Sequence, residues 1–354
     1  MEKQGHLPVL GIVVPCYNEE EVLPETVSQL TRMLERLVRE KLIADGSFML
    51  FVDDGSRDRT WELIEKYRSS NPRVSGLKLA RNAGHQNALL AGLNRARSRV
   101  DCAVSIDADL QDDPEVIREF MIKYHEGFDI VYGIRQSRET DTAFKRSTAQ
   151  TFYKLMRKMG ADIEYNHADY RLMSKRALEQ LERFKEVNLF LRGIVPMIGF
   201  NATRVYFDRK ERFAGESKYP LKKMLAFAWD GITSLSVTPI RLVTAAGFIL
   251  FLISVVAALY SVIQKLAGNT VTGWTSLMLS LWFIGGIQLI SLGLIGEYIG
   301  KIYKEVKRRP LYIVDKDLHA ASESESESDN RTSPLAASDE PRPSDLGHGL
   351  GMRS

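Results

Sequence analysis

Residues 100–115 read VDCAVSIDADLQDDPE, and this stretch decides the fold. Its first seven residues form an apolar run that is typical of a buried strand. Three side chains with oxygen atoms follow at alternate positions, and they are Asp107, Asp109 and Gln111. Asp113-Pro114-Glu115 then has the features of a helix start: an N-cap, a proline at the first helical position and an acid near the positive end of the helix dipole. The stretch predicts a strand, a polar loop and a helix, the repeating unit of α/β folds.

The first half of the chain repeats this alternation. Its apolar runs are continuous, which favours a mostly parallel sheet covered by helices on both faces. The expected strands are Val9–Val14, Phe48–Val52, Val74–Leu79, Val100–Ile106, Asp129–Tyr132 and, less regularly, Tyr170–Met173 and Ala202–Phe207. The expected helices are Glu20–Lys41, Thr60–Ser69, His85–Ala96, Pro114–Glu126 and Phe144–Met159. Ligands of doubly wound sheets bind at the carboxyl ends of the strands, so the loops there are the candidate site.

The loop Asp107–Gln111 is the candidate metal site. Hard divalent cations such as Mg²⁺ and Mn²⁺ prefer oxygen ligands and keep positions open for substrate phosphates. Such a cation would neutralise a diphosphate leaving group. The alternative is a solvated acidic turn, which the strand before the loop and the helix start after it make less favoured.

Polar residues also follow the first three expected strands. Tyr17 is a candidate to stack on a base, and Glu19 or Asp54 is a candidate acceptor from the base imide or the ribose hydroxyls. Arg81-Asn82-Ala83-Gly84-His85 opens a helix at the same edge, either as part of a site or as a simple cap. The chain has no Gly-x-Gly-x-x-Gly and no Walker A motif, which argues against dinucleotide oxidoreductases and P-loop enzymes.

Two charge-free apolar stretches, Leu242–Gln264 and Thr275–Gly296, are each long enough to cross about 30 Å of hydrocarbon. Lysines and arginines on their outer flanks predict that both flanks are cytoplasmic and that the connecting loop lies outside. Helical spacing of apolar residues in Pro220–Val237 predicts an amphipathic helix, either in the membrane interface or packed on the domain. The polar start Met1–Pro8 is unlike a signal peptide. We therefore expect a multi-pass protein of the inner (plasma) membrane with a cytoplasmic N-terminal domain and both termini in the cytoplasm.

The expected parts are a catalytic domain at 1–219, an interfacial helix at 220–240, two transmembrane helices at 241–300, a basic segment at 301–315 and a disordered tail at 316–354. Cys16 and Cys102 lie in expected strands without metal-ligand spacing and are interpreted as buried thiols. The net charge of +3 indicates little about partners, and no nucleic acid is expected among them.

Several motifs together resemble a known family. PCYNEE (15–20), VDDGS (52–56), RNAGHQNALLAGL (81–93), DADLQDDPE (107–115) and DYRLMSKRAL (169–178) resemble inverting family 2 glycosyltransferases of the GT-A fold. Within that family the set is similar to the polyprenyl-phosphate glycosyltransferases, which include bactoprenol glucosyltransferase and dolichol-phosphate mannose synthase. NLFLRGIVPMIGF (188–200), RFAGESKYPLKKML (212–225) and the second apolar stretch resemble the bacterial bactoprenol branch. The resemblance covers roughly residues 7–314.

The resemblance implies roles for individual residues. The nucleotide would be held by Pro15, Tyr17, Asn18, Glu19, Asp53, Asp54, Arg81, Gly84 and Asp107. Asp109 and Gln111 would coordinate the Mg²⁺ or Mn²⁺ ion, and Asp107, Asp109 and Asp169 would be the catalytic residues. Asp169 lies in HADYRL where the family usually has Gly-Asp-Phe-Arg-Leu, which leaves its presentation open. The candidates to hold the acceptor phosphate are Arg135, Lys145, Arg146, Arg192, Arg212 and Lys218.

The implied reaction moves one sugar, with UDP-glucose as the expected donor, to undecaprenyl phosphate with inversion at the cytoplasmic membrane face. A phosphate acceptor is already ionised and needs little general-base help, so we expect positioning and electrostatics to dominate, with Asp169 orienting groups. A homotetramer is expected from the resemblance alone. Two alternatives stay open. A processive polysaccharide synthase would explain the near match Gln180–Phe184 to Gln-x-x-Arg-Trp, and a non-catalytic scaffold would bind nucleotide at the membrane without turnover.

Overall fold

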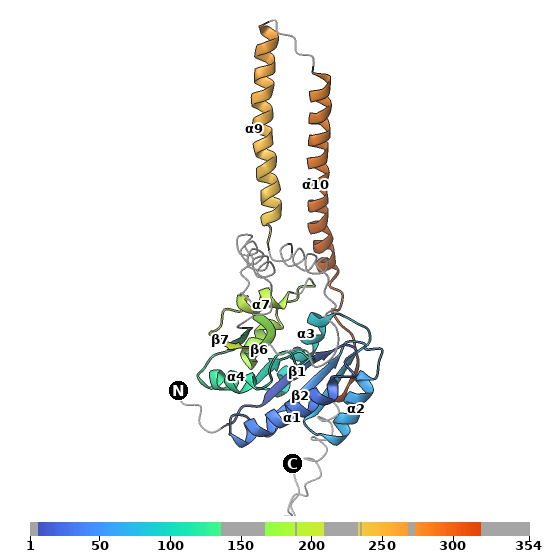
Figure 1. Cartoon of the computed structure of the whole chain (residues 1–354), viewed down its shortest axis with the longest axis vertical. Helices are drawn as coiled ribbons and strands as arrows, with labels where there is room; N and C mark the ends of the chain where they lie inside the picture. Colours follow the sequence, from blue (N-terminus) through green and yellow to red (C-terminus); the bar gives the residue numbers. More distant parts are fainter. Residues whose placement is uncertain are drawn as a thin grey trace, which may run out of the picture. The chain divides into compact units, whose positions relative to one another are not determined.

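A computed structural model describes residues 6–135, 167–187, 190–208, 233, 236–267 and 273–319 (Figure 1). One eight-stranded sheet has the order β7-β5-β6-β4-β1-β2-β3-β8. The strands are β1 (Leu10–Cys16), β2 (Phe48–Asp53), β3 (Val74–Leu79), β4 (Cys102–Ser105), β5 (Ile130–Arg135), β6 (His167–Ser174), β7 (Ala202–Phe207) and β8 (Val314–Asp317). The pairs β1–β2, β1–β4, β2–β3 and β5–β7 are parallel, whereas β6 and β8 pair antiparallel with their neighbours. The predicted mostly parallel α/β sheet is confirmed.

The described helices alternate with the strands as far as β5, and two pairs of helices follow one another later in the chain. The helices are α1 (Leu23–Arg39), α2 (Thr60–Ser70), α3 (His85–Ala96), α4 (Val116–His125), α6 (Lys175–Leu181), α7 (Leu191–Met197), α9 (Thr238–Leu266) and α10 (Trp274–Lys307), with a short 3₁₀ turn at Arg97–Arg99. The predicted bounds of the helix at His85–Ala96 and of the strands at Val74–Leu79 and Ala202–Phe207 are those of the structure. The expected helix Phe144–Met159 and most of Pro220–Val237 lie outside the described residues.

The central strands are buried on both faces. Successive side chains of a strand point to opposite sides of the sheet. In β1, Ile12 and Val14 therefore join a core formed with α1, α2 and α4, whereas Val13 joins a second core formed with α3, α6 and α7. Burial on both faces explains why the strands are continuous apolar runs. Both cysteines are free and buried, as predicted.

The helix start predicted at Asp113-Pro114-Glu115 is wrong by two residues, because α4 begins at Val116. The Asp113 carboxylate does accept a backbone hydrogen bond, from Glu115 at 3.1 Å, and the Asp113 carbonyl accepts one from Val116 at 3.1 Å. These bonds span three residues or fewer, so they form a turn that leads into the helix. The acidic loop is correspondingly longer than the sequence indicated.

The boundary predicted at residue 316 is also wrong, because Val314–Asp317 forms strand β8. This strand pairs antiparallel with β3, beyond the two long helices in the chain. Ionic contacts hold it: Arg95 Nε lies 2.6 Å from Asp317 Oδ2, and Lys316 Nζ lies 3.1 Å from Glu65 Oε1. Its sequence, VDKD, lacks an apolar run, and its partners precede it by more than 200 residues, so local pattern did not reveal it.

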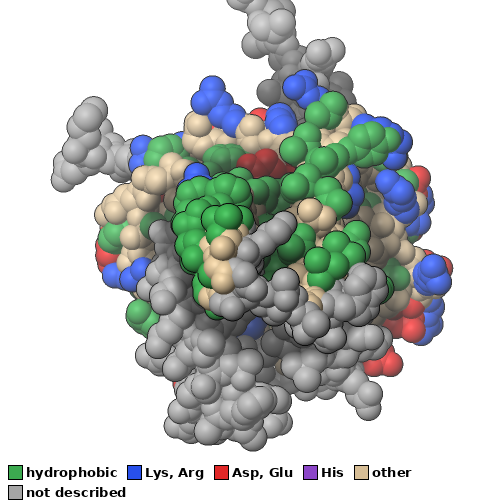
Figure 2. Space-filling model, turned by 90° about the horizontal axis from the view of Figure 1, so that it is seen from above, with side chains coloured by type: hydrophobic (Ala, Val, Ile, Leu, Met, Phe, Trp, Pro, Cys, Tyr) green, Lys and Arg blue, Asp and Glu red, His purple; other side chains and the backbone are tan. Residues whose placement is uncertain are grey.

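The helices α9 and α10 contain segments long and apolar enough to cross a membrane, Thr238–Gln264 and Ser280–Lys307. Among the residues of their most apolar windows whose side chains the structure describes, none is buried. Figure 2 looks at the molecule from above the view of Figure 1, and hydrophobic side chains, drawn green, gather near the centre of this view. Exposed apolar surface on this scale marks a contact with lipid or protein, which agrees with the predicted spans.

The pairing of β8 with β3 generates a prediction. Arg95 and Asp317 are about one quarter exposed, so reversing one charge opposes like charges in a partly buried place. We expect Asp317→Arg to lower the free energy of unfolding by about 1–3 kcal/mol, and the double variant Arg95→Asp/Asp317→Arg to regain most of it. Chemical denaturation in detergent measures both, with the half-exposed Asp315→Asn as control. Equal stability of Asp317→Arg and wild type would contradict the docking of β8.

Candidate active site

The loops that follow β1 and β2 hold each other at the carboxyl edge of the sheet. The Asn18 N–H donates to Ser56 Oγ at 3.0 Å, and Asn18 Oδ1 accepts from the Arg57 N–H at 2.9 Å. The Glu19 N–H donates to Thr60 Oγ1 at 2.9 Å. Asn18 adopts a left-handed conformation with φ of 55°, which asparagine tolerates better than most residues. The turn leaves Tyr17 42% exposed and free to present its ring, whereas Pro15 is buried in β1.

Asp54 holds the loop that follows β3. Its side chain is buried, and its two oxygen atoms accept from the Ala83 N–H at 2.6 Å and the Gly84 N–H at 3.0 Å. Burial raises the pKa of Asp54, and these two amide hydrogen bonds act against the rise. The carboxylate thereby fixes the end of the Arg81–Gly84 loop. Gly84, the last residue before α3, has a φ of 93°. Whether Asp54 also meets a nucleotide, as the resemblance implies, stays a prediction.

Asp53 lies beside it at the end of β2 and is fully buried. One carboxylate oxygen accepts from the Ser56 N–H at 3.2 Å, while Oδ2 is buried and has no hydrogen-bond partner among the described residues. Burial raises the pKa of Asp53. A buried acceptor left unsatisfied is costly and calls for an explanation, and a ligand group that donates a hydrogen bond would supply one.

The loop after β4 carries the acidic motif. Thr26 Oγ1 donates to the Ala108 carbonyl at 2.8 Å and so anchors the loop to α1. Asp109 Oδ1 accepts from the Gln111 N–H at 3.1 Å, and Leu110 between them has a φ of 55°. Asp107, Asp109 and Gln111 are all partly exposed.

These oxygen donors fit a hard divalent cation by their chemistry. Within the described parts of the chain, no group of three or more His, Cys, Asp or Glu side chains is placed to hold a metal ion. Mg²⁺ is commonly bound through one or two carboxylates together with substrate phosphates. The loop is therefore suited to a cation that arrives with a diphosphate, and less to a metal site made by the protein alone.

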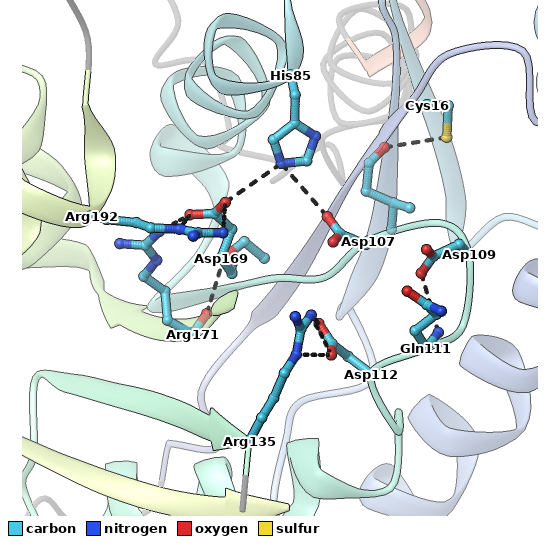
Figure 3. Close-up of polar contacts among 12 residues, drawn as sticks. Cys16, His85, Asp107, Asp109, Gln111, Asp112, Arg135, Asp169, Arg171 and Arg192 are labelled. Carbon is cyan, nitrogen blue, oxygen red and sulfur yellow. Dashed lines mark hydrogen bonds and ion pairs between the residues drawn. The ribbon is translucent and has the colours of Figure 1, made fainter. Parts of the chain in front are cut away.

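Asp169 of β6 is enclosed by two arginines (Figure 3). Arg171 Nη2 lies 2.5 Å from Oδ1, and Arg192 Nη2 of α7 lies 3.1 Å from Oδ2. Burial by itself raises the pKa of Asp169, but Arg192, Arg171 and His85 outweigh it and hold the pKa well below its usual range. Arg171 is only 2% exposed, and the Asp169 carboxylate is the charge that balances it.

His85, the first residue of α3, lies between the two acidic centres. Its Nε2 atom is 3.6 Å from Asp107 Oδ1 and 3.8 Å from Asp169 Oδ2, and its side chain is 44% exposed. The sequence reasoning included His85 in a motif but gave it no role in the site. One feature of the sequence could have indicated a role for His85. It directly follows Gly84 and begins a helix at the carboxyl edge of the sheet, where the other candidate residues lie.

Arg135 is paired rather than isolated. Its guanidinium approaches Asp112 with Nη2–Oδ1 at 2.8 Å and Nη2–Oδ2 at 3.1 Å. Asp112 is 1% exposed, and burial raises its pKa to about 6 although Arg135 acts against the rise. The sequence did not indicate that Asp112 is the partner of Arg135. Of the predicted acceptor-phosphate residues, Arg135 and Arg192 thus hold carboxylates, while Lys145, Arg146, Arg212 and Lys218 lie outside the described residues.

Comparisons with known proteins place this site in a family. Residues 11–182 match Glycosyl transferase family 2, and residues 238–302 match the GtrB C-terminal hairpin. The chain is 64% identical over 312 residues to the uncharacterized glycosyltransferase YkoT of Bacillus subtilis, covering 88% of this chain and 93% of that protein. The chain belongs to glycosyl transferase family 2 and is a glycosyltransferase.

A second relative is named for a more particular activity. The chain is 41% identical over 309 residues to the SfII prophage-derived bactoprenol glucosyl transferase of Shigella flexneri, covering 87% of this chain and 97% of that protein. Among solved structures, a mannosyltransferase of Pyrobaculum calidifontis matches 85% of this chain and 88% of its own, at 16% identity and a TM-score of 0.40. The near-complete coverage of the curated relatives includes both the catalytic sheet and the two apolar helices.

Gly55 permits close contact between the loop that follows β2 and the loop that contains Arg81 and Asn82. It has a φ of +67°, and a Cβ there would lie 2.7 Å from the Arg81 carbonyl carbon and the Asn82 nitrogen. Gly55→Ala should lower the free energy of unfolding by about 1–3 kcal/mol and weaken nucleotide binding, because the Arg81 loop must move. Denaturation and calorimetric titration measure the two effects. Gly46→Ala is the matched control, since its Cβ would meet nothing within 4 Å. An unchanged Gly55→Ala protein would refute the close packing of the loops.

Removal of the Asp169 charge should leave Arg171 buried and unbalanced. We expect Asp169→Asn to lower the free energy of unfolding at pH 7 by about 3–5 kcal/mol, whereas the exposed Asp208→Asn should change little. The pKa of Asp169 is lowered on folding from 3.8, so its stabilising effect is present above that pH and is lost as the pH falls further. The stability difference between wild type and variant should therefore shrink below about pH 4. A constant difference down to pH 2 would contradict the assignment.

Proposed function

We propose that this glycosyltransferase moves a single sugar, with glucose from UDP-glucose as the expected substrate, to a polyprenyl phosphate such as undecaprenyl phosphate. The observation that carries the proposal is the similarity of both parts of the chain, catalytic sheet and apolar hairpin, to bactoprenol glucosyl transferases over 87% of its length. A sugar donor soluble in water and an acceptor held in lipid require these two parts in one protein. The product would be a lipid-linked sugar.

The donor side would be formed by the loops after β1, β2, β3 and β4. Tyr17 is exposed and suited to stack on the base, and Asp53 Oδ2, which has no partner among the described residues, would be a candidate acceptor of a hydrogen bond. Arg81 is exposed on the adjoining loop. Asp109 and Gln111 would hold a divalent cation, Mg²⁺ or Mn²⁺, which when bound neutralises the charge of the diphosphate leaving group.

The acceptor side would depend on arginine rather than on a general base. A phosphate monoester is ionised at neutral pH, so its oxygen needs no proton removed before attack. Asp169, whose pKa is held low by two arginines, is a poor base and is suited to orient Arg192. Arginine grips phosphate through paired hydrogen bonds, and Arg192 is partly exposed beside the site. Attack on the anomeric carbon from the side opposite the diphosphate would invert its configuration.

The membrane would hold the lipid acceptor near this site. The last turn of α10 carries Lys304 and Lys307, and Arg308 and Arg309 follow it. Positive charge at the end of a span favours the cytoplasmic side, where nucleotide sugars are present. We therefore place the catalytic domain and both termini in the cytoplasm, at the inner (plasma) membrane. A homotetramer remains an expectation drawn from the resemblance.

The two alternatives receive no support from the site. The near match to the synthase signature ends α6, and there Gln180 Oε1 accepts from Arg183 Nη1 at 3.1 Å in an exposed place. Such an exposed bond within one helix end is typical of a surface helix. A scaffold without turnover would have no need of the cluster formed by Asp107, His85, Asp169 and Arg192.

The test uses purified protein in detergent, undecaprenyl phosphate, Mg²⁺ or Mn²⁺ and a panel of labelled UDP- and GDP-sugars. We expect label from one donor in an organic-extractable lipid, lost on addition of EDTA and restored by excess Mg²⁺ or Mn²⁺. Asp109→Ala should lower kcat by about 100-fold or more without unfolding, because the cation would lose a ligand.

The control is Asp113→Ala, which removes a neighbouring acid that serves the turn before α4 and lies outside the proposed ligand set. Full activity of Asp109→Ala, or activity that survives EDTA, would overturn the metal assignment. A growing water-soluble polymer would favour the synthase, and nucleotide binding without either product would favour the scaffold.

A further inference from the structure

The imidazole of His85 faces two carboxylates without a hydrogen bond to either. Its Nε2 atom lies 3.6 Å from Asp107 Oδ1 and 3.8 Å from Asp169 Oδ2 (Figure 3). Hydrogen bonds from nitrogen to oxygen are normally about 2.7–3.2 Å long, so both distances are too great. Ionised carboxylates only accept hydrogen bonds, so the tautomer that suits this place is the one with its hydrogen on Nε2. A donor thus points between two acceptors and is committed to neither.

The donor His85 Nε2 lies between two acceptors, Asp107 Oδ1 and Asp169 Oδ2, and this arrangement limits which chemical groups can bind there. A hydroxyl both accepts and donates, so one hydroxyl can accept from His85 Nε2 and donate to Asp107 or Asp169. A phosphate oxygen at the same place would face two negative charges at close range. An apolar group would leave the His85 Nε2 and Asp107 Oδ1 atoms without a hydrogen bond, which is costly where water is displaced.

The backbone of His85 is fixed from two sides. The Gly84 N–H before it donates to the Asp54 carboxylate at 3.0 Å. After it, Gln86 Oε1 accepts from the Leu191 N–H at 2.9 Å, which joins the first turn of α3 to the helix that carries Arg192. The backbone that carries the imidazole is therefore held in place before substrate arrives, and preorganised sites discriminate best between ligands.

We propose that His85 is a specificity-determining residue that donates a hydrogen bond to a hydroxyl of the transferred sugar, with Asp107 and Asp169 as the acceptors of that hydroxyl's own hydrogen. Asp107 belongs to the proposed donor loop and Asp169 to the proposed acceptor side, so a group between them lies where the sugar would pass. The inference rests on the proposed function in one respect, namely that the transferred group is a sugar.

The first test measures binding and needs no lipid acceptor. Calorimetric titration compares the nucleotide sugar that the enzyme uses with the corresponding nucleoside diphosphate, each with Mg²⁺, for wild type and for His85→Ala. We expect His85→Ala to raise the Kd of the nucleotide sugar by about 10-fold and to leave the Kd of the nucleoside diphosphate within about 2-fold. His85→Gln, which retains an N–H donor, should recover part of the loss.

The second test identifies the hydroxyl. Donors that lack one sugar hydroxyl each are compared in kcat/KM for wild type and His85→Ala. With the parent donor the variant should be about 10- to 100-fold slower, whereas with one deoxy donor the two proteins should be equally fast, because the contact is already missing. His125→Ala is the matched control, since this exposed histidine lies on α4 and contacts the Leu42 carbonyl.

The outcomes separate the inference from the proposed function. An equal loss with the parent and with every deoxy donor, or an equal loss of sugar-nucleotide and diphosphate binding, would overturn the role of His85. Absence of lipid-linked product from wild type would count against the proposed acceptor, while a selective loss of sugar-nucleotide binding in His85→Ala would still support the inference.

Discussion

Burial of the central strands on both faces is the constraint on which the rest of this structure depends. Because β1 is covered by helices on either side and pairs in parallel with β2 and β4, the carboxyl ends of these strands meet at one edge. Loops bring Tyr17, Asp54, Asp107 and Asp109 to that edge, whereas His85, Asp169 and Arg192 come from α3, β6 and α7. The loops are then tied to one another, by Asn18 to Ser56 and by Asp54 to Gly84, so that the edge is held as one surface.

Charge balance shapes that surface. A buried Arg171 has the Asp169 carboxylate as its counter-ion, and the same carboxylate binds Arg192 from a neighbouring helix. Breaking such a buried set is more costly than the set is stabilising, since it leaves an uncompensated charge. The arrangement makes Asp169 unsuited to proton transfer and suited to orient its partners. Asp112 and Arg135 form a second pair nearby, in which burial and pairing act in opposite directions on the carboxyl pKa.

The chain returns to the catalytic sheet after its two apolar helices. Strand β8 adds to the edge of the sheet beside β3, and the Ile313 carbonyl accepts from the Ala80 N–H at 2.9 Å. Ala80 directly precedes Arg81 in the loop whose other end Asp54 holds. The segment that follows α10 thus contacts the proposed donor loop, which gives the two apolar helices a structural connection to the site.

The sequence by itself determined the alternation of strands and helices, the two apolar helices and the loop that carries Asp107 and Asp109. These features follow from local periodicity, from caps and from composition, which act over a few residues. Only the tertiary structure decided which side chains meet. It placed His85 between two carboxylates, bound Arg135 to Asp112 and added β8 to the sheet. These partners are separated by between 22 and more than 200 residues, and no local pattern encodes a contact made only when the chain has folded.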